Sequence, residues 1–132
     1  MKPNSPFSMV ARYNSFRYAF RGAAVLVRTE HNTWGHALAT IGVTAAGLYF
    51  GLTRLEWCAI ALTIAGVWTA EAFNTAIEYL TDLVSPEYHP LAGKIKDVSA
   101  AAVLFAVIGS IVVGVLILGP HVMEVVRRAL PY

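Results

Sequence analysis

The sequence predicts an all-α membrane protein: an N-terminal amphipathic interfacial helix plus three transmembrane helices, in a single membrane domain over residues 1–132. Of the 132 residues, 57% are hydrophobic and only 14% are charged, too few charges to cover a soluble globule of this size. The apolar residues gather in long runs that lack the period-two alternation of membrane strands. Because lipid tolerates only helices or closed barrels, these runs predict helices.

The first predicted element, about residues 7–31, is an amphipathic helix that lies in the membrane interface. On a helical wheel, aromatic and small apolar side chains share one face and arginines lie beside it: Tyr13, Phe16, Phe20, Ala24 and Val27, with Arg17, Arg21 and Arg28. This pattern is typical of a helix whose arginines reach lipid phosphates, and it predicts that Phe16 and Phe20 contact lipid. An Arg-rich targeting segment is the alternative, but Glu30 and His31 continue straight towards the first apolar run.

Three transmembrane helices are predicted next, over about residues 36–53, 55–84 and 91–118, with a C-terminal tail over 119–132. Ala37 to Thr53 carries no formal charge over seventeen residues, and Val98 to Leu118 carries none over twenty-one. A bilayer core of about 30 Å needs about 20 helical residues, so each run can span or nearly span it.

The basic residues divide unevenly between the two sides of this predicted bundle. Seven lie in the N-terminal segment and in the loop before the third span, whereas three lie on the other side. The positive-inside rule therefore predicts a cytoplasmic N-terminus and an external C-terminus. The second membrane helix then runs inwards, and its second half lies on the side where ATP is found.

That second half, residues 71–82 (EAFNTAIEYLTD), carries an unusual row of polar side chains. Glu71, Asn74, Thr75, Glu78 and Asp82 fall within about a third of the helix circumference. A carboxylate facing lipid costs several kcal/mol, so this row must face protein or a wet cavity. A deep, poorly solvated carboxylate suits a general base, and a shallower one near aqueous phosphate suits a divalent cation. Two alternatives remain open: a structural membrane subunit in which this row makes polar contacts between helices, and a small oligomeric transporter or channel in which it forms a proton or ion pathway.

The next segment is a short hairpin that is rich in functional groups. Ser85-Pro86 is expected to end the second membrane helix, and Pro90 to begin the third. Lys96 could neutralise phosphate charge, and Asp97 could orient that lysine. His89 on its own is more often a turn or capping residue. The histidines lack the spacing of zinc ligands, and the glycine that a phosphate-binding loop requires upstream of Gly93 is missing.

The stretch EAFNTAIEYLTDLVSPEYHPLAGKIKDVSAAAVL resembles the signature of the prokaryotic diacylglycerol kinase and undecaprenol kinase family. The likeness extends upstream through SFRYAFRGAAVLVRTEHN and covers about residues 12–118. It implies an ATP- and Mg²⁺-dependent lipid kinase of the bacterial inner membrane that phosphorylates the primary hydroxyl of a membrane lipid alcohol. It also implies a homotrimer with active sites shared between subunits, and partners that are lipid and ATP, without nucleic acid.

The resemblance also implies roles for individual residues. Glu71 would be the general base on the lipid hydroxyl, and Asn74 would position the reacting groups. Glu30 and Glu78 would hold the metal on ATP and so contact the nucleotide. Further nucleotide contacts are implied for Tyr18, Glu87, Tyr88, His89, Lys96 and Asp97.

Two positions depart from the family pattern. Trp34 stands where relatives often have a basic residue, and Ala11 stands at a basic nucleotide contact for which Arg12 is the nearest substitute. Both bear on nucleotide affinity. Diacylglycerol and undecaprenol both present one primary hydroxyl, but the segments 28–32 and 55–57 are more similar to the undecaprenol kinase branch.

Small residues predict close helix contacts within an oligomer. Ala102, Ala106, Ser110 and Gly114 recur at every fourth position of the third membrane helix, and Gly47 and Gly51 share that spacing in the first. Such stripes let helices approach closely in lipid.

Overall fold

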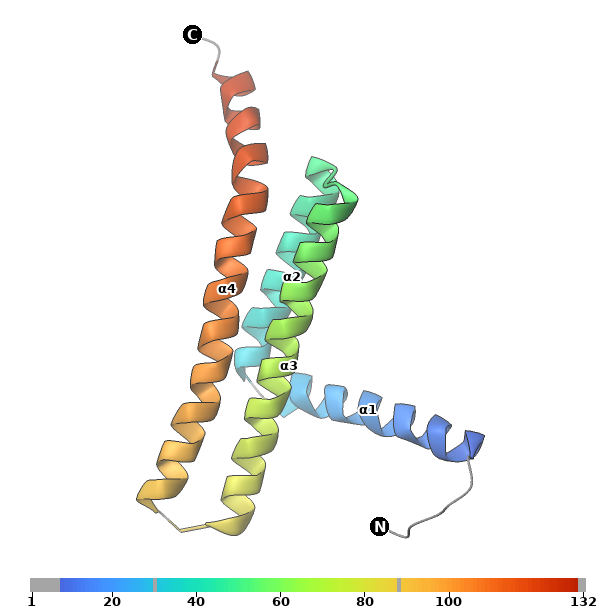
Figure 1. Cartoon of the computed structure of the whole chain (residues 1–132), viewed down its shortest axis with the longest axis vertical. Coiled ribbons are helices and arrows are strands. Elements are labelled where there is room, and N and C mark those ends of the chain that lie inside the picture. The colour runs from blue at the N-terminus through green and yellow to red at the C-terminus, as the bar shows by residue number, and fades with distance from the viewer. Residues whose placement is uncertain (1–7, 30, 88, 131–132) are drawn as a thin grey trace.

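The structure is a computed structural model that describes residues 8–29, 31–87 and 89–130. These residues form helices α1 (Met9–Thr29), α2 (His31–Phe50), α3 (Arg54–Val84) and α4 (Pro90–Ala129), and none of them lies in a strand. The predicted all-α class is therefore confirmed. Helices α2, α3 and α4 run along the long axis of the molecule, and α1 extends to one side of them (Figure 1).

Helix α1 begins at a serine cap and meets α3 with its small side chains. The hydroxyl of Ser8 accepts a hydrogen bond from the Ala11 backbone N–H at 3.3 Å, which satisfies one of the unpaired donors of the first turn. Ala19 and Ala23 face α3, whereas Phe16 and Phe20 are exposed. The aromatic side chains are thus available to a bilayer, and their contact with lipid stays a prediction.

Two local features form the turn between α2 and α3: a left-handed glycine and a capping box. Gly51 has φ +67°, and the Leu52 N–H donates to the Gly47 carbonyl at 3.1 Å, which is the pattern of a helix that ends on a left-handed residue. Thr53 then caps α3 by exchanging hydrogen bonds with Glu56, as in a capping box. A Cβ on Gly47 would come within 2.8 Å of the Trp57 ring. The small residue at Gly47 therefore makes room for a contact within the chain, where the sequence suggested a contact between chains.

The hairpin between α3 and α4 forms as predicted. Helix α3 ends at Val84 and is capped by Ser85, whose N–H donates to the Thr81 carbonyl at 2.8 Å, and Pro86 follows. His89 caps α4 by accepting from the Leu91 N–H on Nδ1 at 3.2 Å, and Pro90 is the first helical residue. The two helices pack along each other more extensively than any other pair of helices in the described part of the chain.

Two helices of the described residues, α3 and α4, are long and apolar enough to cross a membrane. Their outward faces carry large apolar side chains, such as Phe105 and Leu116, that are exposed in the single chain. Helix α2 has a sufficient length, 20 residues, but it is not one of these two helices. The first of the three predicted spans, residues 36–53, therefore has no counterpart among these two helices. It stays a prediction.

Helix α4 continues past residue 118, where the sequence predicted the membrane helix to give way to a tail. It passes through Pro120 and ends at Ala129. Gly119 has no Cβ to meet the proline ring, which eases the restriction that proline places on its predecessor. The next residue, His121, lies with Nε2 3.1 Å from Glu56 Oε1 and stacks on Phe50. These contacts hold the added turns against the start of α3.

Candidate functional site

A polar network joins α3 to α4 on the hairpin side of the bundle. Asn74 donates from Nδ2 to Glu78 Oε1 at 2.9 Å, one turn further along α3. The Ser99 hydroxyl on α4 donates to Asn74 Oδ1 at 2.7 Å. Ser99 is buried, and Asn74 and Glu78 are half-buried. Ser99 of α4 thus orients the Asn74 amide so that its nitrogen points to the Glu78 carboxylate on α3.

A cation lies one turn nearer the hairpin. Lys96 Nζ is 2.5 Å from Asp82 Oδ1, so the two helices are also joined by an ion pair. The Lys96 backbone carbonyl accepts from the Ser99 hydroxyl at 2.8 Å, which links the turn that carries the lysine to the amide network. Asp97 is exposed beside it. A phosphate that binds Lys96 would compete with Asp82.

Glu71 lies deeper along α3 and is almost fully buried. It lines a pocket of about 330 Å³ between the start of α2, the middle of α3 and α4, together with Asn74. His36 of α2 lines the same pocket, with Nε2 3.7 Å from Glu71 Oε2. The α4 side of the pocket is apolar. A carboxylate in such surroundings is shielded from bulk water, as a general base for a poorly acidic hydroxyl requires.

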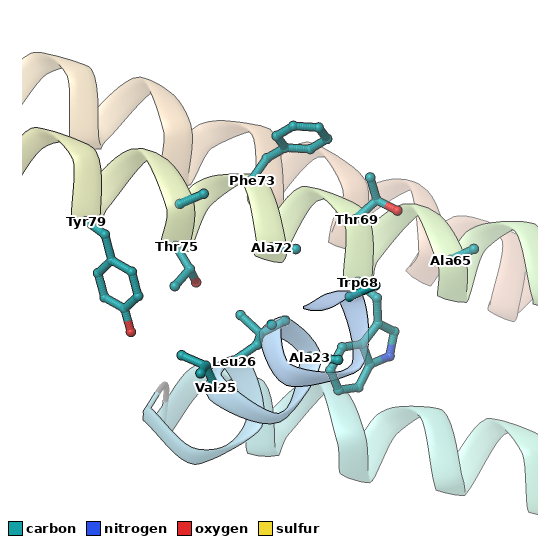
Figure 2. A pocket seen from close by; sticks show the side chains of 13 residues that line it. Ala23, Val25, Leu26, Ala65, Trp68, Thr69, Ala72, Phe73, Thr75 and Tyr79 are labelled. Atoms are coloured by element: carbon teal, nitrogen blue, oxygen red, sulfur yellow. The ribbon is translucent and has the colours of Figure 1, made fainter. Parts of the chain in front are cut away.

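An apolar groove of about 790 Å³ lies beside this pocket, between α1 and α3. Trp68, Thr75 and Tyr79 project from α3 towards α1 (Figure 2). On α1 the opposite wall includes Ala23, Val25 and Leu26. The Thr75 hydroxyl is buried without a hydrogen-bond partner among the residues described. The groove and the acidic pocket therefore share α3, with Thr75 on one side of it and Asn74 on the other.

The other predicted site residues are spread more widely. Glu30 and Tyr88 lie outside the described residues. Tyr18 is exposed on α1, Glu87 is exposed in the hairpin, and His89 serves as the cap of α4. The described chain thus brings Glu71, Asn74, Glu78 and Lys96 together along the α3–α4 interface, without the α1 residue Tyr18.

The carboxylate ligands in this site fit a magnesium ion of the kind that accompanies a nucleotide. Within residues 8–29, 31–87 and 89–130, there is no cluster of three or more His, Cys, Asp or Glu side chains that could form a complete cage. Mg²⁺ in kinase sites is usually bound by one or two carboxylates plus substrate phosphates and water. Glu78 is half-buried and faces Asn74, so it can supply one such carboxylate.

Sequence reasoning missed three participants in this site. His36 and Ser99 belong to other helices than the carboxylates they meet, and no local spacing links them to Glu71 or Asn74. The partner of Lys96 was also missed, although Asp82 had been placed on the polar face of α3. A search for polar residues on the facing side of α4 would have found Ser99.

An acidic site buried among membrane-type helices, beside an apolar groove, defines a small all-helical membrane protein built to act on a substrate with both polar and apolar parts. Residues 17–118 match the family model described as prokaryotic diacylglycerol kinase. The match covers more than half of the chain, and the chain belongs to this family.

Named relatives agree with the family. The chain is 43% identical over 109 residues to the undecaprenol kinase of Bacillus subtilis (strain 168), covering 82% of this chain and 88% of that protein. It is 36% identical over 111 residues to the diacylglycerol kinase of Synechocystis sp., of which it spans 63%. It is 40% identical over 55 residues to the diacylglycerol kinase of Escherichia coli (strain K12), 45% of that protein. The predicted lipid kinase is thereby confirmed as a class, and the transporter or structural-subunit alternative is not favoured.

Proposed function

We propose that the protein phosphorylates the primary hydroxyl of undecaprenol, with ATP as donor and Mg²⁺ as cofactor, at the cytoplasmic face of a bacterial inner membrane. The observation that carries the proposal is the row along α3 in which Glu71 is buried and Asn74 and Glu78 are half-buried. Undecaprenol is favoured over diacylglycerol because the undecaprenol kinase of Bacillus subtilis is more similar and is covered over more of its length than the diacylglycerol kinase of Synechocystis.

Glu71 acts as the general base in this proposal. Its side chain lines the 330 Å³ pocket between the start of α2, the middle of α3 and α4. A lipid alcohol can reach this depth by lateral diffusion while its chain stays in the bilayer. The carboxylate accepts the hydroxyl proton as the oxygen attacks the terminal phosphate of ATP. Asn74, fixed by Ser99, orients the reacting groups.

The nucleotide lies towards the hairpin. Glu78, with Glu30, holds the Mg²⁺, which supplies charge neutralisation on the phosphates. Lys96 leaves Asp82 to contact a phosphate, and Asp97 orients this lysine. Tyr18, Glu87, Tyr88 and His89 complete the nucleotide contacts. Phosphoryl transfer depends mainly on positioning and charge neutralisation, and both are available from these residue types.

The proposed topology has three spans, in which α2 is the first, α3 the second and α4 the third. The seven-to-three division of basic residues supports a cytoplasmic N-terminus and an external C-terminus. A homotrimer is the assembly that the family resemblance implies. The exposed apolar side chains along α4 leave a surface that lipid or further copies of the chain can cover.

The roles of the two glutamates are tested by separate amide substitutions. Glu71→Gln removes the base but keeps the shape, so kcat should fall by about 10²–10⁴-fold while nucleotide binding stays intact. Glu78→Gln removes a metal-ligand charge, so it should weaken Mg-ATP binding as well, and excess Mg²⁺ should partly restore activity.

Nucleotide binding, Mg²⁺ titration and particle size should be measured on both variants. If the glutamates only hold helices together, both variants will lose assembly and activity in parallel. That result would remove the assignment of roles.

A further inference from the structure

The proposed roles use Glu71 but leave its neighbour His36 without a function. His36 Nε2 lies 3.7 Å from Glu71 Oε2, and the side chains are 19% and 4% exposed. Both line the 330 Å³ pocket, whose other described lining residues are Asn32, Asn74, Ala100, Val103, Leu104 and Val107. Among these lining residues, His36 and Glu71 are the two that can gain or lose a proton. The imidazole is the more exposed of the two.

The pair is held in register by contacts between α2 and α3. Thr40 donates from its hydroxyl to the His36 carbonyl at 2.7 Å, one turn along α2. The same hydroxyl accepts a hydrogen bond from Trp68 Nε1 at 3.1 Å. Trp68 lies one turn before Glu71 on α3. The turn that carries His36 is therefore fixed against the turn that carries the carboxylate.

The proposed reaction creates a requirement that Glu71 cannot meet alone. Each transfer of a phosphoryl group from ATP to an alcohol releases one proton, which Glu71 accepts. The carboxylic acid must lose this proton before it can act as a base again. With 4% of its side chain exposed, Glu71 has little direct access to bulk water.

We propose that His36 takes the proton from Glu71 after each transfer and passes it to solvent. This inference rests on the proposed role of Glu71. His36 acts through Glu71 and contacts neither ATP nor the lipid hydroxyl. It is therefore a positioning residue, which returns Glu71 to its carboxylate form. Imidazole suits this task because one ring nitrogen can accept a proton while the other donates one, and because as a free side chain it is a stronger base than a carboxylate.

The steps balance. The alcohol O–H bond and the bond between the terminal phosphorus of ATP and its bridging oxygen break, the new O–P bond forms, ADP leaves with the bridging oxygen, and the proton goes to Glu71. The acid then gives the proton to His36 Nε2, which restores the carboxylate and leaves an imidazolium. The imidazolium releases a proton to water and returns to the neutral ring. A separation of 3.7 Å exceeds a hydrogen bond, so the transfer needs a small approach of the two groups or one bridging water.

Two substitutions of His36 test the proposal in the full-length protein. His36→Gln keeps a polar side chain that cannot carry a proton, so kcat should fall by about 10-fold, less than the 10²–10⁴-fold that a direct base contributes. The KM values for ATP and lipid should stay unchanged. His36→Ala leaves room in the pocket, and added imidazole at constant pH and ionic strength should restore its kcat.

The matched control is His121→Gln. His121 is also paired with a glutamate, since its Nε2 lies 3.1 Å from Glu56 Oε1, but it lies at the far end of α3 from the hairpin. Its substitution should leave kcat unchanged and insensitive to imidazole. In the double variant Glu71→Gln with His36→Gln, kcat should equal that of Glu71→Gln alone, because His36 acts only through the carboxylate.

A His36→Gln variant with native kcat would overturn the proposal. So would a loss in both His36 variants that imidazole does not restore and that follows particle size or KM. Additive losses in the double variant would equally contradict a role through Glu71. A native protein that is inactive on both lipids would instead contradict the proposed function, so the two failures are distinguishable.

Discussion

Removal of the Ser99 hydroxyl tests whether α4 orients the amide that faces Glu78. In Ser99→Ala, the donor to Asn74 Oδ1, 2.7 Å away, is lost while the backbone of α4 is kept. A hydrogen bond contributes about 0.5–1.5 kcal/mol net, and a buried acceptor left without its donor costs about 1–3 kcal/mol. Because Asn74 is half-buried and water can partly replace the hydroxyl, we expect a cost near 1 kcal/mol. That corresponds to a loss of about 5-fold in an equilibrium constant.

The loss should appear in the affinity for Mg-ATP, because a misplaced Asn74 no longer holds Glu78. Isothermal titration of Mg-ATP into the purified variant measures it. Ser110→Ala is the matched control: it removes a hydroxyl from the same helix, but one that donates only to the Val107 carbonyl on that helix. Equal affinities for Mg-ATP in the two variants would refute the reasoning.

Two further predictions concern a charge and a close contact. Asp82→Asn should lower the KM for ATP by up to about 5-fold, because exposed ion pairs contribute about 0.2–1 kcal/mol and Lys96 would no longer be shared; a raised KM in steady-state assays would contradict this. Gly47→Ala should destabilise the protein by about 1–3 kcal/mol, since its Cβ would lie 2.8 Å from the Trp57 ring. Gly66→Ala, with open space around it, is the control, and equal melting temperatures for both variants would contradict the packing argument.

The helical class and the hairpin could be predicted because they depend on local physics. Apolar runs without alternation favour helices, and Ser85, Pro86 and Pro90 act within a turn of their own positions. The polar face of α3 was predictable for the same reason, since residues three and four apart share a helix face. Among the described residues, Glu71 is buried and Asn74 and Glu78 are half-buried.

Contacts between helices could not be predicted in this way. His36 meets Glu71 across 35 positions of sequence, and the pairing depends on the register of α2 against α3. Gly47 has the spacing of an oligomer contact, but the side chain it accommodates, Trp57, comes from the next helix of the same chain. A C-terminal tail was predicted from residue 119, yet α4 passes through Pro120 and continues to Ala129, with His121 held against the start of α3. In each case a tertiary partner decided between two local possibilities.

We propose above that the protein transfers a phosphoryl group from ATP to undecaprenol with Glu71 as the general base. The most direct measurement incubates the purified protein with labelled ATP and Mg²⁺ and supplies undecaprenol and diacylglycerol in parallel mixed micelles. We predict Mg²⁺-dependent labelling of undecaprenol with a higher kcat/KM than for diacylglycerol, and loss of labelling in Glu71→Gln. Labelling of diacylglycerol alone would contradict the lipid assignment, and labelling of neither lipid would contradict the kinase itself.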